Sequence, residues 1–84
     1  MYLAKIVVMV RRSILDPQGK AVLHALQSLG MNSAEDVRIG KFVEMKIHGV
    51  DRTEAERLTK EACKKLLANP VMEDYTFSLE KVDV

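Results

Sequence analysis

Apolar and polar residues alternate over the first ten positions of the chain. The even positions from Tyr2 to Val10 are all apolar, whereas the odd positions include Lys5 as well as apolar residues. This period of two predicts a strand that is fully buried on one face and partly buried on the other.

A helical pattern follows this strand, over about residues 17–29. Asp16 suits the N-cap, because its carboxylate can accept from the free N–H groups of the first turn, and Pro17 suits the first helical position. Gly30 suits the left-handed position that ends the helix. Gly19 is unexpected in the first turn, since glycine costs a helix about 1 kcal/mol relative to alanine. A close backbone contact at Gly19 would account for it.

The next segment allows two interpretations. Gly40-Lys41 could form a two-residue hairpin turn, as in a ferredoxin-like fold. However, the apolar residues on both sides have odd numbers, which keeps them on one face of an uninterrupted strand: Val37, Ile39, Val43, Met45 and Ile47. We therefore expect a single long strand over about residues 36–48, bent or bulged at Gly40.

A second helix and a last strand complete the chain. The helix begins with an N-cap at Asp51 and ends at Asn69-Pro70, and its apolar stripe includes Ala55 and Leu66. Alternation around residues 75–79 predicts the last strand. The expected fold is an α+β two-layer sandwich in the order β-α-β-α-β, with both helices on one face of the sheet. The reverse face is too apolar to be left in water, so we expect another subunit to cover it: Leu3, Val7, Met9 and Phe42.

Composition limits the class of protein. The 84 residues predict a single domain over residues 1–84, and the net charge of +1 argues against nucleic acid as a partner. One cysteine excludes an intramolecular disulfide. Neither a signal peptide nor an apolar run of membrane-spanning length is present, so we expect a cytoplasmic protein with no membrane partner.

No residues form a recognisable catalytic, cofactor-binding or metal-binding motif. His24 and His48 have no partner at a motif spacing, and Cys63 is spaced like a core residue. Arg38 and Lys41 flank a glycine, as in some phosphate sites, but they lie inside a predicted strand rather than before a helix. A free-standing enzyme is therefore the least favoured interpretation.

Three segments in series identify a known family. They are residues 15–22 (LDPQGKAV), residues 36–41 (DVRIGK) and residues 65–75 (KLLANPVMEDY). In order, spacing and chain length they resemble PurS, the small-subunit family of bacterial and archaeal phosphoribosylformylglycinamidine (FGAM) synthase.

The resemblance implies a non-catalytic subunit of a glutamine-dependent carbon–nitrogen ligase in de novo purine biosynthesis. In that family the PurL subunit holds ATP, Mg and substrate, and the PurQ subunit is the glutaminase. PurS forms homodimers or larger oligomers, bridges the other two subunits and assists ammonia transfer. The alternative is a ferredoxin-like domain that senses a small ligand, which would require the hairpin at Gly40.

Polar residues of the first two segments are the candidate partner contacts. They are Asp16, Gln18, Gly19, Arg38 and Lys41; apart from the N-cap at Asp16, the sequence offers them no internal role. On this interpretation Gly19 lets the backbone of a partner approach, so Gly19→Ala would slightly stabilise the helix yet impair assembly.

Overall fold

The computed structural model of the chain describes residues 1–69 and 71–82, and it confirms the α+β class and the order of the elements. These are β1 (Tyr2–Val10), α1 (Pro17–Ser28), β2 (Gly40–Ile47), α2 (Arg52–Ala62), the π-helical turn η1 (Cys63–Leu67) and β3 (Glu73–Lys81). The last strand is longer than the alternation predicted. Pro70, the expected helix stop, lies outside the described residues.

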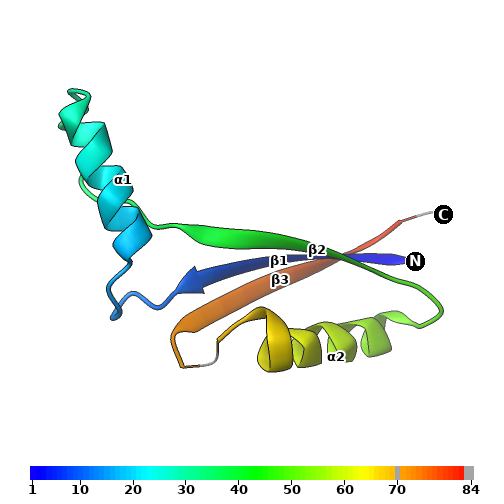
Figure 1. The fold of residues 1–84 in the computed structure, drawn as a ribbon. Coiled ribbons are helices and arrows are strands. Elements are labelled where there is room, and N and C mark those ends of the chain that lie inside the picture. Colours follow the sequence, from blue (N-terminus) through cyan, green and yellow to red (C-terminus); the bar gives the residue numbers. More distant parts are fainter. Residues whose placement is uncertain (70, 83–84) are drawn as a thin grey trace.

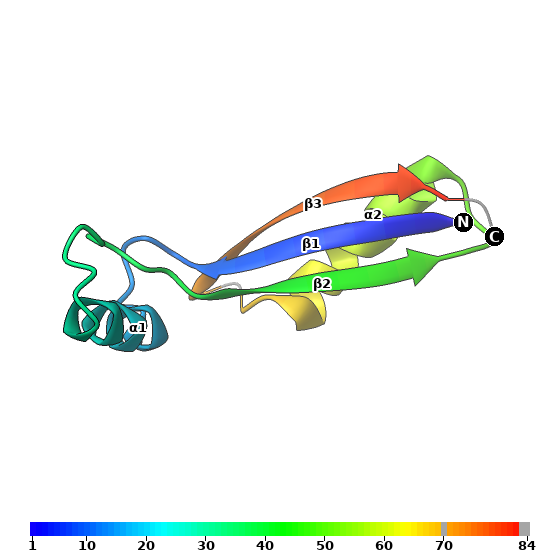
Figure 2. The same ribbon diagram turned by 90° about the horizontal axis from the view of Figure 1, so that it is seen from above.

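The sheet has three strands in the order β2-β1-β3, and both neighbours run antiparallel to β1 (Figures 1 and 2). Ile6 at the centre of β1 lies opposite Val43 on one side and Phe77 on the other. Because side chains alternate along each strand, even residues of β1 share a face with odd residues of β2 and β3. The predicted alternation and the odd-number argument are thus confirmed within the sheet.

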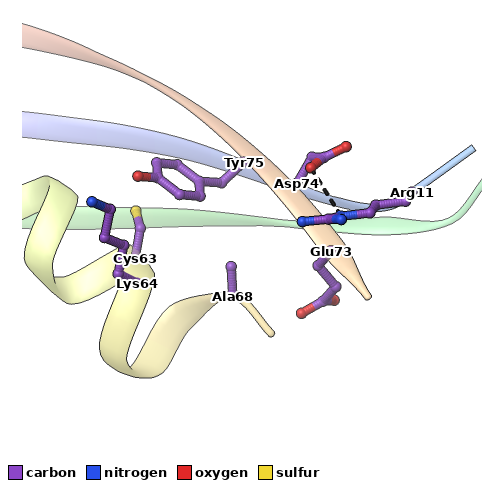
Figure 3. A pocket seen from close by; sticks show the side chains of 7 residues that line it. All are labelled: Arg11, Cys63, Lys64, Ala68, Glu73, Asp74 and Tyr75. Atoms are coloured by element: carbon purple, nitrogen blue, oxygen red, sulfur yellow. Dashed lines mark ion pairs between the residues drawn. The ribbon is translucent and has the colours of Figure 1, made fainter. Parts of the chain in front are cut away.

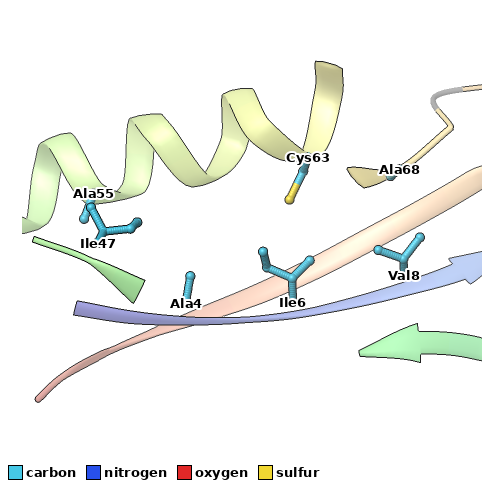
Figure 4. Close-up of a cluster of buried hydrophobic side chains, with 7 residues drawn as sticks. All are labelled: Ala4, Ile6, Val8, Ile47, Ala55, Cys63 and Ala68. Carbon is cyan, nitrogen blue, oxygen red and sulfur yellow. The ribbon is translucent and has the colours of Figure 1, made fainter. Parts of the chain in front are cut away.

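The core lies between this face and α2 (Figure 4). Ala4, Ile6 and Val8 of β1 are completely buried, as are Thr59 and Cys63 on the helical side. The hydroxyl of Thr59 donates to the Ala55 carbonyl at 2.8 Å, so this buried polar group has a partner.

One predicted core position of the second helix is wrong. Leu66 is 82% exposed, although it continues the apolar stripe of the sequence. The amide of Ala68 donates to the Cys63 carbonyl five residues earlier, at 3.0 Å. This wider turn rotates the residues of η1 relative to the preceding helix, so Cys63 and Ala68 face the core and Leu66 does not.

The expected position of α1 is also wrong. None of its residues belongs to the core, and it projects beyond the end of the sheet, on the side away from α2 (Figure 1). Among the described elements, α2 alone covers a face of the sheet. The segment that returns from α1 to β2 contacts α1 instead: the Met31 amide donates to the Leu26 carbonyl at 3.0 Å, and the Val37 carbonyl lies against Gly19.

The single long strand is shorter than predicted. Strand β2 begins at Gly40, and residues 35–39 form an irregular segment that leads from α1 to the sheet. The hairpin alternative is wrong, because β2 pairs with β1 and not with the preceding residues. A side chain at position 40 would collide with the Val8 carbonyl oxygen, so Gly40 allows close approach of the two strands.

We expect Ile6→Ala to lower the free energy of unfolding by about 2–5 kcal/mol, because it leaves a cavity under α2. Leu66→Ala is the matched control, and its effect should stay within about 0.5 kcal/mol. Urea unfolding at one fixed chain concentration measures both. Equal effects of the two substitutions would contradict this description of the core.

Candidate docking site

The carboxylate of Asp16 joins two segments that are far apart in the sequence. Its Oδ1 accepts from the Gly19 amide at 2.9 Å, which caps α1, and its Oδ2 accepts from the Ile39 amide at 2.8 Å. The start of α1 is thereby tied to the residue that precedes β2. We call this contact set the Asp16 clamp: Asp16, Gly19, Val37, Arg38 and Ile39.

Gly19 has a structural reason for being glycine. It is buried, and a Cβ at this position would lie well inside the van der Waals distance of the Val37 carbonyl oxygen, and 2.9 Å from Asp16 Oδ2. The backbone that approaches Gly19 is therefore the chain's own. This changes the expected effect of Gly19→Ala on the isolated chain from stabilising to destabilising.

Arg38 joins the Asp16 clamp to the end of β1. Its guanidinium donates to the carbonyl of Val10, the last residue of β1. The N–H groups of Gly19 and Ile39, with the nearby charge of Arg38, lower the pKa of Asp16 below its ordinary value of 3.8. Arg38 thus has an internal role that the sequence did not reveal, and Asp16 has a second one, the bond to the Ile39 amide, beside the predicted N-cap.

The other two candidate contact residues, Gln18 and Lys41, are exposed. The structure brings them together with Asp16 around one hollow of about 340 Å³, with Val10, Ile39 and Gly40 in its wall. Residues from the first two sequence segments therefore form one surface, at the junction of α1 with the sheet.

A second hollow lies between η1 and the start of β3 (Figure 3). Arg11 Nε lies 3.3 Å from Asp74 Oδ1 at its rim, and Cys63 lies at its base. Burial raises the pKa of the Cys63 thiol, which disfavours the nucleophilic thiolate. His24 on α1 and His48 after β2 are both exposed. Neither lines the hollow at Cys63.

Among residues 1–69 and 71–82, no three His, Cys, Asp or Glu side chains are placed to hold a metal ion. No helix in this part of the chain has the length and apolar character needed to cross a membrane.

Sequence reasoning missed the backbone partners of the clamp, because the Val37 carbonyl and the Ile39 amide carry no side-chain signal. The one usable signal was a glycine in the first turn of a helix. Sequence reasoning did find the apolar reverse face of the sheet, where Val7 is 43% and Phe42 is 55% exposed.

The fold defines a small α+β protein whose sheet is covered by one helix and extended by a second, and whose candidate site is a hollow at the junction of α1 with the sheet. Residues 3–81 match the PurS family, described as phosphoribosylformylglycinamidine (FGAM) synthase. The chain belongs to this family.

Relatives and solved structures agree with the assignment. The FGAM synthase subunit PurS of Bacillus subtilis is 51% identical over 98% of this chain and 96% of its own, and its crystal structure gives a TM-score of 0.89. PurS of Methanocaldococcus jannaschii is 34% identical over 99% of this chain and all of its own, with a TM-score of 0.87. A chain in the structure of PurLQS from Thermotoga maritima is 25% identical over 95% of this chain and 99% of its own, with a TM-score of 0.83.

Gly19→Ala should lower the free energy of unfolding by about 1–3 kcal/mol, because the added methyl group meets backbone that cannot move freely. Gln18→Ala, one residue away and exposed, should change it by less than about 0.5 kcal/mol. Urea unfolding gives both values. Stabilisation by Gly19→Ala would show that the Val37 contact is absent in solution.

The clamp should weaken in acid. Only ionised Asp16 accepts both bonds, and its folded-state pKa lies below 3.8. Its contribution to stability is therefore complete above the ordinary pKa and is lost as the pH falls through the lowered value. The amide proton shifts of Gly19 and Ile39, measured by NMR, should titrate together with a midpoint below 3.8. They should stop titrating in Asp16→Asn, whereas independent titration of the two amides would contradict a shared carboxylate.

Proposed function

We propose that this chain bridges a PurQ glutaminase and a PurL synthetase and assists the transfer of ammonia between them. As a member of the PurS family, the chain is a subunit of FGAM synthase in purine biosynthesis. The complex uses ATP and glutamine-derived ammonia to convert formylglycinamide ribonucleotide to the amidine. ATP, Mg and substrate bind to PurL, this chain supplies no catalytic residue, and the complex works in the cytoplasm.

The observation that carries this proposal is the likeness over nearly the whole chain to a chain of the Thermotoga maritima PurLQS structure. A bridging role also suits a surface that gathers Gln18 and Lys41 around the fixed junction of α1 with the sheet. Free ammonia is mostly ammonium at neutral pH, and ammonium is not a nucleophile. A subunit that holds two active sites in register keeps ammonia from escaping and from being protonated.

Self-association belongs to the same proposal. Val7 and Phe42 on the reverse face of the sheet leave apolar area in contact with water, which monomeric proteins usually avoid. A second copy of the chain that covers this face would remove that area from water and give a bridging subunit two equivalent partner sites.

Reconstitution tests the function directly. Purified PurL and PurQ should show glutamine-dependent FGAM formation only when this chain is added. Formation at the same rate without the chain, or no formation with it, would overturn the proposal.

Lys41→Glu should raise the dissociation constant of the complex about tenfold, because it reverses a charge at the hollow beside Gln18; this corresponds to about 1.4 kcal/mol. Lys60→Glu on the outer side of α2 is the charge-matched control. Sedimentation velocity of the mixed subunits measures both. Equal effects of the two substitutions would remove Lys41 from the docking surface.

A further inference from the structure

A third hollow, of about 400 Å³, adjoins the Asp16 clamp. Side chains from the turn after β1, from the start of α1 and from the segment that returns to β2 line it, among them Arg12, Ser13, Leu15, Lys20 and Asp36. We call it the basic hollow. It is built largely from the first two of the three segments that identify the family.

Two cations and one carboxylate of the basic hollow have no partner within the chain. Among the described residues, neither Arg12 nor Lys20 forms an ion pair or a side-chain hydrogen bond, and Asp36 forms none either. The other charged groups of the wall belong to the Asp16 clamp, where hydrogen bonds to the backbone already engage them. The charges that remain available to a ligand are thus mainly positive.

The neighbouring hollow adds another available cation. Asp16 lines both hollows, so the two meet at the clamp. Lys41 lies at the second one and has no ion-pair partner in the described part of the chain. The Glu73 carboxylate at that hollow is engaged, because it accepts from the Asn69 amide at 2.7 Å. An excess of positive charge therefore borders the clamp on both sides, which favours an acidic ligand.

The backbone that carries these cations is fixed before any partner binds. The Ile14 amide donates to the Arg11 carbonyl at 2.9 Å, which closes the turn that contains Arg12. The Lys20 amide donates to the Asp16 carbonyl at 3.0 Å in the first turn of α1. A ligand has only the ends of the side chains to order, so binding costs little conformational entropy.

Leu15 indicates that the ligand is a protein segment rather than a small anion. It is 64% exposed and lines the same hollow as the two cations. A phosphate group has no apolar surface to pack on a leucine. A protein segment can place a carboxylate and an apolar side chain side by side, as interfaces with an apolar centre and a polar rim do.

We propose that the basic hollow receives an acidic segment of a synthase subunit, PurL or PurQ. Carboxylates of that segment bind Arg12 and Lys20, and a neighbouring apolar side chain packs on Leu15. This inference rests on the proposed function. It extends the docking surface from Lys41 across the Asp16 clamp to the turn after β1.

The charges are tested by the kinetics of binding to PurL and to PurQ, each immobilised for biolayer interferometry. Arg12→Ala combined with Lys20→Ala should lower the association rate constant for one subunit about tenfold at about 0.1 M salt, because exposed charges act mainly on the encounter. At about 1 M salt, where charges are screened, the variant and the unaltered chain should associate at the same rate. Lys60→Ala combined with Lys64→Ala removes the same charge from α2 and η1 and should change neither rate.

The apolar contact has a different kinetic signature. Leu15→Ala should raise the dissociation rate constant for the same subunit at least about threefold and leave association unchanged, because packing acts on the formed complex. Leu66→Ala, which is even more exposed on η1, is the control and should change neither rate constant.

Two results would overturn the inference. One is an unchanged association rate of the double variant with both subunits; if FGAM formation still requires the chain, the proposed function then stands. The other is that inorganic phosphate shifts the amide signals of Ser13 and Lys20 in NMR spectra while the substitutions leave subunit binding unchanged, because the hollow would then hold a small anion. If binding depends on these charges but FGAM formation does not require the chain, the inference stands and the proposed function fails.

Discussion

One carboxylate determines the shape of this protein. Asp16 binds the amide of Gly19 at the start of α1 and the amide of Ile39 before β2, so it fixes both ends of an excursion of about 25 residues from the sheet. Hydrogen bonds to an ionised acceptor are about twice as strong as neutral ones. Without these two bonds, α1 would be joined to the sheet through Arg38 and by irregular segments. The direction in which the helix projects therefore depends on a few polar atoms rather than on a core.

This arrangement leaves one face of the sheet without a covering helix. The core of Ala4, Ile6 and Val8 lies under α2 alone, and a chain of this length buries only about 60–65% of its unfolded surface. A helix packed on the other face would have enlarged the core. The clamp instead leaves apolar residues of the reverse face, such as Val7 and Phe42, in contact with water.

Local chemistry in the sequence gave sound predictions, whereas tertiary contacts could not be predicted from it. Alternation in β1, the N-caps at Asp16 and Asp51 and the positive φ of Gly30 follow from short-range rules, and all are present. The position of α1 could not be predicted, because an amphipathic helix shows only that one side is buried and not what buries it. Leu66 was misplaced because a π-helical turn shifts the periodicity without any mark in the sequence. In the candidate site, Gly19 signalled a close contact, but its partner is a backbone oxygen that any residue at position 37 would supply.

A rigid projecting helix suits a docking role better than a flexible one. Twelve residues are too few for a stable helix in water, so α1 depends on its cap and on the return segment for its order. The helix is already ordered in the folded chain. Binding of a partner to α1 therefore costs less conformational entropy, and the affinity is higher. The same bonds set the angle at which the helix meets a partner. The proposed bridging role requires both properties. The Asp16 clamp provides them without enlarging the core.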